Sequence, residues 1–159
     1  MHALKKIVDS MVEKFCIFLY AGLVVLVTWQ VFTRFVLNDP SVISEELAKV
    51  CFVWLVLFGA AYVFGERGHM AIEFIRDKFP VKLKLSLSIF IELVILGFSM
   101  AILVIGGYKV TMMTMGQSSA ALRVPVGYIY AALPLSGSLI VFYTLNNIVN
   151  LFQKRVAIE

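Results

Sequence analysis

Four long apolar blocks alternate with short polar segments along the chain. They predict membrane-spanning helices over residues 15–37, 44–65, 83–115 and 125–151, because about 20 consecutive apolar residues cross the hydrocarbon core of a bilayer. As one α-helix the third block would be about 50 Å long at 1.5 Å per residue, so we expect it to tilt or protrude. Pro125 suits the start of the fourth helix, and Pro134 is expected to kink it.

Two further segments have an amphipathic period. Residues 70–79 place apolar side chains on one helical face and charged side chains on the opposite face. About ten residues are too few to cross a bilayer, so this segment predicts a helix lying flat in the interface. Residues 4–15 show the same period. They either form a second interfacial helix or continue the first spanning helix beyond the membrane.

Composition and charge place the chain in a membrane and orient it. Hydrophobic residues make up 61% and charged residues 15%, against about 45–50% and 25% in soluble domains. Ten of the 14 Lys and Arg residues flank the two chain ends and the polar segment at residues 66–84. By the positive-inside rule these parts face the cytoplasm, and the turns at Asp39 and Gly116 face out. The net charge of +4 therefore orients the protein and does not indicate nucleic-acid binding. The predicted fold class is an all-α integral membrane protein with four transmembrane helices, cytoplasmic N and C termini and short interfacial helices, in a single domain.

Residue types that carry catalysis are scarce. The two histidines, His2 and His69, lie outside the predicted spans, and the sequence has no Cys-His metal spacing, phosphate-binding glycine loop or nucleophile motif. We therefore expect no enzyme activity, no cofactor and no metal site.

Ionisable side chains at membrane depth are costly and are candidates for function. Glu92 lies inside the third block. It could relay a proton or cation, contact a partner subunit, or be a neutral or hydrogen-bonded group within the bundle. Arg34, Glu45, Glu46 and Lys49 flank the first outer turn. They predict an interfacial ionic network, a contact surface for another protein, or both, and we hypothesise that Arg34 pairs with Glu45 or Glu46.

Large and small side chains lie side by side in several spans. Trp54 and Phe58 are one helical turn apart, next to Gly59. This pattern is typical of a lipid-facing surface or of a helix-packing ridge. Gly106-Gly107 and Ser136-Gly137-Ser138 are small-residue patches that permit close helix approach.

Several of these motifs together resemble one known family. They are RFVLNDP at 34–40, SEELA at 44–48, FVW at 52–54, FGA at 58–60 and RGHMAI at 67–72, which includes Arg67 and His69, together with Pro125, Tyr130 and Pro134 in the second half. In this pattern the chain resembles the small membrane subunit (DctQ-like, Q subunit) of TRAP, tripartite ATP-independent periplasmic, transporters. The resemblance covers nearly the whole chain and is most specific in the first half.

The resemblance implies a function and partners. It implies a non-catalytic subunit in the bacterial inner membrane, surrounded by lipid, that scaffolds a large elevator-type membrane subunit. That partner would carry the substrate and sodium sites, and a periplasmic binding protein would deliver an organic acid such as sialic acid or a four-carbon dicarboxylate. Two alternatives remain at this stage: a self-sufficient small proton- or sodium-coupled transporter that uses Glu92, and a membrane anchor of a redox enzyme.

Overall fold

The computed structural model describes residues 2–66 and 81–156 and shows an all-α fold in them. The elements are α1 (His2–Phe35), α2 (Val42–Gly65), α4 (Val81–Phe98), η1 (Ser99–Gly106), α5 (Gly107–Thr114), α6 (Gly127–Tyr130) and α7 (Ala132–Val156). Four of the described helices are long and apolar enough to cross a membrane, which confirms an all-α membrane protein with four spanning helices, while the cytoplasmic position of the two termini stays a prediction. The predicted interfacial helix at 70–79, with Arg67 and His69 before it, lies outside the described residues.

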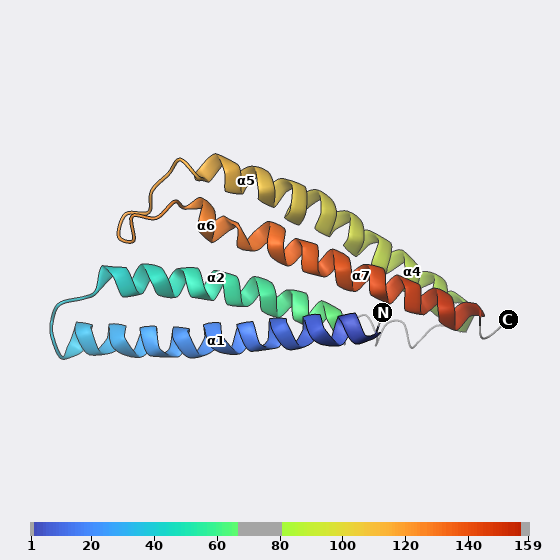
Figure 1. Ribbon diagram of the computed structural model, residues 1–159, viewed down its shortest axis with the longest axis horizontal. Helices are drawn as coiled ribbons and strands as arrows, with labels where there is room; N and C mark the ends of the chain where they lie inside the picture. The colour runs from blue at the N-terminus through green and yellow to red at the C-terminus, as the bar shows by residue number, and fades with distance from the viewer. Residues whose placement is uncertain (1, 67–80, 157–159) are drawn as a thin grey trace.

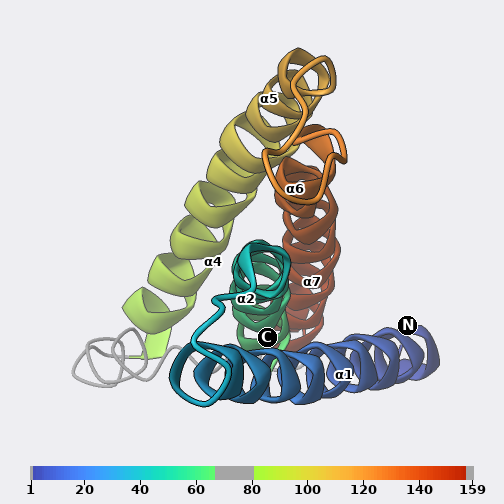
Figure 2. The ribbon, with the colours of Figure 1, turned by 90° about the vertical axis from the view of Figure 1, so that its left-hand side faces the viewer.

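The helices form two antiparallel hairpins that meet along α2 and α7 (Figure 1). α1 packs on α2, α2 packs on α7, and α7 packs on α4 and η1. Figure 2 shows α1 and the α4–η1–α5 helix diverging on either side of the α2–α7 pair. The result is an open array whose lateral surface is largely apolar, and the fourth span, Gly127–Leu151, is the most buried of the four described spans.

The two ends of the molecule contain different segments of the chain. α1 begins and α7 ends at one end, the terminus end, whereas the α1–α2 turn (residues 36–41) and the long loop before α6 (residues 115–126) lie at the other, the turn end (Figure 1). α1 is one helix from His2 onwards. The amphipathic stretch at residues 4–15 therefore belongs to the first spanning helix and is not a separate interfacial helix.

The turn between α1 and α2 follows from local sequence. Asn38 adopts a left-handed backbone with φ 52, a conformation that asparagine tolerates better than most residues. The Ser41 hydroxyl then caps α2 by accepting a hydrogen bond from the Ser44 backbone N–H at 3.4 Å.

The third and fourth spans deviate from regular α-helix where they face each other. The third span is continuous, but its central turn η1 is a π-helix, a widening that the sequence pattern did not predict. The fourth span is interrupted at Ala131, between α6 and α7. Pro134 lacks the N–H that would bond the Tyr130 carbonyl, which accounts for the interruption three residues before the ring, while the predicted kink stays a prediction.

Glycines allow these two spans to approach closely. A Cβ built on Gly137 would lie 2.6 Å from the Leu103 Cβ, and one on Gly107 would lie 2.8 Å from the Leu133 Cβ. Near the turn end, a Cβ on Gly127 would lie 2.8 Å from the Thr111 carbonyl oxygen. The prediction of close approach at Gly107 and Gly137 is thus confirmed, and the three glycines define what we call the glycine seam.

Candidate functional site

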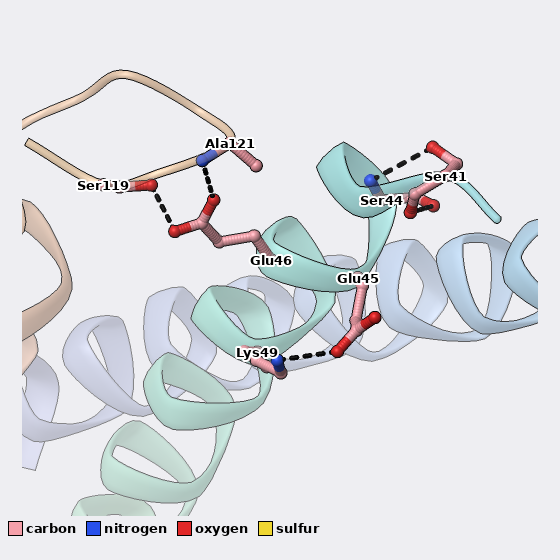
Figure 3. A network of polar contacts seen from close by, with 7 residues as sticks. All are labelled: Ser41, Ser44, Glu45, Glu46, Lys49, Ser119 and Ala121. Atoms are coloured by element: carbon pink, nitrogen blue, oxygen red, sulfur yellow. Dashed lines mark hydrogen bonds and ion pairs between the residues drawn. The ribbon is translucent and has the colours of Figure 1, made fainter.

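The turn end contains a polar network centred on Glu46, in the second turn of α2 (Figure 3). The Glu46 carboxylate accepts a hydrogen bond from the Ser119 hydroxyl. It also accepts hydrogen bonds from the backbone N–H groups of Ala121 and Leu122, at 2.8 and 3.0 Å. Hydrogen bonds to a charged carboxylate are stronger than neutral ones. Glu46 therefore ties the loop between the third and fourth spans to the second span.

The loop that Glu46 holds is itself a tight turn. The Ser119 N–H donates to the Val124 carbonyl at 2.9 Å, the Arg123 N–H donates to the Ser119 carbonyl at 3.2 Å, and the Val126 N–H donates to the Gln117 carbonyl at 2.8 Å. Arg123 closes the turn with φ 55. We call residues 117–126 the outer turn.

The other charged groups of this end do not pair as hypothesised. Lys49 donates to Glu45 at 2.7 Å, one helical turn apart on the exposed face of α2. Glu46 is engaged by the outer turn, and the Arg34 guanidinium lies over the Phe35 ring at 5.9 Å. Among the described residues no ion pair joins Arg34 to Glu45 or Glu46, because each carboxylate has a nearer donor, and the Arg34 charge acts on Glu45 only at longer range.

A second polar cluster lies near the terminus end. The Lys5 ammonium donates to Asp9 at 2.8 Å and to Glu66 at 3.3 Å, joining α1 to the end of α2. Lys5 also lies 5.9 Å from the ring centroid of Tyr143, which is fully buried on α7. Gly65 makes room for that ring, since a Cβ there would lie 2.7 Å from the Tyr143 Cε1. The terminus end is thus closed by contacts among three helices.

Trp54 and Phe58 form a helix-packing ridge. Their rings stack on α2 with centroids 5.6 Å apart, and Phe15 of α1 packs edge-on against both, at 6.1 and 5.0 Å. Of the two predicted environments, the structure supports packing between helices. Gly59 does not contribute, because a Cβ built on it would meet nothing within 4 Å.

Of the remaining candidates, Pro125 belongs to the outer turn, whereas Glu92 and Tyr130 lie on other elements. Glu92 is on α4, partly exposed, in the third span. Pro125 pairs with Ser118 in an isolated bridge just before α6, and Tyr130 ends α6 with its side chain exposed. The structure brings neither Glu92 nor Tyr130 to Glu46, so the candidate residues do not form a single site.

An apolar groove of about 300 Å³ lies between α2, α4, η1 and α7. It is lined by aliphatic and aromatic residues together with Ser99 and Ser136, which are both buried. None of its lining residues, all in the described part of the chain, is charged. A groove of this kind suits hydrocarbon and does not suit an organic anion, which needs a cation or several donors.

The partners of Glu46 could not be found from the sequence. Ser119 lies 73 positions further along the chain, and the other two donors are backbone groups that carry no residue signature. Nothing in the sequence indicated that Tyr143 is buried, because a tyrosine in an apolar block is equally typical of a membrane interface. The ion pair between Lys49 and Glu45 could be predicted from the sequence, since the two residues have the spacing of a helical ion pair.

The fold and these networks define a class of protein. Within residues 2–66 and 81–156, no group of three metal-ligating side chains comes together, and the polar networks join helices to one another. Four apolar spanning helices make the chain a multi-pass membrane protein.

Sequence comparisons identify the family. The family model for the DctQ component of tripartite ATP-independent periplasmic transporters matches residues 23–154, and the chain belongs to this family. It is 34% identical over 150 residues to the sialic acid TRAP transporter small permease protein SiaQ of Vibrio cholerae, covering 94% of this chain and 86% of that one. Half of the chain matches a putative TRAP transporter small permease protein of Haemophilus influenzae at 30% identity.

A third relative is a much longer protein. The sialic acid TRAP transporter permease protein SiaT of Haemophilus influenzae is 30% identical over 66 residues, which are 42% of this chain and 11% of that permease. Family membership makes the present chain a small permease component of the inner membrane, and not an enzyme.

Proposed function

We propose that this chain is the non-catalytic scaffold of a TRAP transporter. In this proposal it packs beside a large elevator-type membrane subunit that carries the substrate and sodium sites. A periplasmic binding protein delivers the substrate to the pair. The name of the Vibrio cholerae relative makes sialic acid the first substrate to test, followed by a four-carbon dicarboxylate.

One observation carries the proposal: charge-free stretches make up most of the described spans, and the fourth span, Gly127–Leu151, has no charged residue at all. The groove between the hairpins is lined without any charge. A chain that moved an organic anion by itself would need donors or cations at the midplane. The match to part of SiaT is further support, because a segment like this one occurs there within a longer permease chain.

The open helix array suits a scaffold. An elevator-type carrier must slide against a part that stays fixed, and a broad, well-anchored part resists being dragged. The described spans offer long apolar faces to a partner or to lipid, while the outer turn, the Phe15–Trp54–Phe58 ridge and the glycine seam hold the spans together.

Reconstitution tests the function. With the large subunit, the loaded binding protein and a sodium gradient in liposomes, we expect uptake of sialic acid only when this chain is also present. Without the chain, uptake should fall to the level of empty liposomes, and the chain alone should transport nothing. Full uptake by the large subunit and binding protein without this chain would contradict the scaffold role. Uptake by the lone chain would instead support the self-sufficient transporter.

Orientation is tested by cysteine labelling. We propose that the terminus end is cytoplasmic and the turn end periplasmic, because most basic residues flank the former. In a variant with Cys16 and Cys51 replaced by alanine, an impermeant maleimide added to intact cells should label Asn38→Cys and Gln117→Cys. Lys6→Cys, exposed at the start of α1, should react only after the cells are lysed. The reverse pattern would invert the orientation.

A further inference from the structure

We propose that Glu46 is a positioning residue for docking: it holds the outer turn in the shape that presents Arg123 to an acidic surface of the periplasmic binding protein. The inference rests on the proposed function and adds to it a residue, a mechanism and the charge of the partner surface. Its basis is the set of hydrogen bonds by which Glu46 of the second span holds the loop between the third and fourth spans.

The contacts of Glu46 converge on the part of the outer turn that precedes Arg123. Both carboxylate oxygens are engaged, one by the Ser119 hydroxyl and the other by the N–H groups of Ala121 and Leu122. Consecutive backbone N–H groups that point at one anion form a nest. The nest exists only while these residues keep their turn conformation, so the carboxylate selects that conformation.

Arg123 is the residue whose backbone needs this support. A non-glycine residue with positive φ is held in a sparsely populated region at a free-energy cost, and it persists when its surroundings fix it. Arg123 has φ 55 and an exposed side chain. Its N–H bonds the Ser119 carbonyl at 3.2 Å, and Ser119 is held by Glu46. Without Glu46, the turn loses three of the hydrogen bonds that oppose relaxation of Arg123, and only the backbone hydrogen bonds within the turn remain.

The charges at the turn end indicate what Arg123 would meet. Glu45 is balanced by Lys49, and the Glu46 charge is directed into the outer turn. Among the described residues at this end, the exposed charges that remain are the basic Arg34, Lys109 and Arg123 and the acidic Asp39. Arg34 lies on α1, Lys109 on α5, Arg123 in the outer turn and Asp39 in the α1–α2 turn. The excess positive charge is therefore spread over the whole turn end. An acidic protein surface is the complement of such a face.

Removal of Glu46 should affect docking of the binding protein in two ways that oppose each other, so the measured direction shows which of them dominates. Loss of one negative charge should by itself improve docking of an acidic partner. Loss of the turn conformation should weaken docking, because Arg123 is no longer held in place. The proposal therefore predicts weaker docking in Glu46→Ala although the face becomes more positive.

The experiment uses the complete complex of both membrane subunits in liposomes, with the binding protein titrated at saturating substrate. Glu46→Ala and Arg123→Ala should each raise the binding-protein concentration needed for half-maximal uptake about five- to tenfold, with the maximal rate unchanged. In the wild type this concentration should rise with salt, and in Arg123→Ala it should rise less. The double variant Glu45→Gln/Lys49→Gln removes the neighbouring ion pair at constant net charge and should behave as wild type.

Amide hydrogen exchange measures directly whether the outer turn keeps its conformation. In Glu46→Ala the amides of Ala121 and Leu122 should exchange faster, whereas the double variant should leave them protected. Unchanged exchange, or an unchanged or lower half-maximal concentration in Glu46→Ala, would overturn the proposal. An Arg123→Ala effect that disappears when phosphatidylglycerol is left out of the vesicles would overturn it in favour of a lipid contact. Uptake that does not need this chain would refute the proposed function and the docking role, while amide exchange would still report whether Glu46 orders the turn.

Discussion

Replacing Tyr143 with alanine is expected to destabilise the isolated chain by about 3–5 kcal/mol, the cost of removing a large buried aromatic side chain. The Tyr143 side chain is fully buried and lies where α1, α2 and α7 meet. Lys5 approaches its ring from α1, and Gly65 of α2 is so close that a Cβ there would lie 2.7 Å from the ring. Alanine would leave a cavity that three rigid helices cannot collapse to fill. The two hairpins would lose the contact that joins them near the terminus end.

The measurement is the midpoint of unfolding of the purified chain in detergent, followed by circular dichroism. Leu145→Ala is the matched control, because Leu145 is two residues further along α7 and is 48% exposed. It should cost far less than Tyr143→Ala. Equal midpoints for the two variants would show that packing at Tyr143 does not hold the hairpins together.

The number and type of the helices could be predicted because the signal is local. Each span is a block of apolar residues long enough to cross a bilayer, and its length and charge are visible in a single stretch of sequence. The effect of Pro134 was predictable for the same reason, since a missing N–H acts on its own helix. The π-turn at Ser99–Gly106 was not predictable, because nothing in those eight apolar residues distinguishes one helix pitch from another.

The partners of charged residues were harder to predict, for a physical reason. Arg34 was matched with Glu45 or Glu46 by nearness in sequence and by sign of charge. Glu45 instead bonds Lys49 on its own helix, and Glu46 bonds a hydroxyl and two backbone N–H groups. A backbone donor can come from any residue, so the sequence contains no pattern that announces it. Only the fold shows that Glu46 meets residues 119–122 of the outer turn.

The packing of glycines was also hard to predict from the sequence. Gly59 lies beside Trp54 and Phe58, a pattern typical of a lipid-facing surface or of a helix-packing ridge, and Gly137 lies in a small-residue patch that permits close helix approach. In the structure a Cβ on Gly59 meets nothing within 4 Å, whereas a Cβ on Gly137 meets Leu103 at 2.6 Å. Which glycine faces a neighbouring helix depends on the rotation of the helix about its axis, and a block that is apolar all round does not encode that rotation.

This difference predicts a large effect at Gly137. Gly137→Leu should destabilise the isolated chain by about 3 kcal/mol, at the upper end of the range for overpacking. The added Cβ would lie 3.2 Å from the backbone carbonyl carbon of Leu103, as well as close to its side chain. A backbone atom cannot rotate away, so α7 and η1 would have to separate and open the glycine seam. Gly59→Leu is the matched control: it adds the same side chain where there is space and should leave the unfolding midpoint unchanged or slightly raised, since leucine favours helix over glycine. If Gly137→Leu unfolds at the same midpoint as Gly59→Leu, the close approach of the third and fourth spans contributes nothing to the stability of the chain.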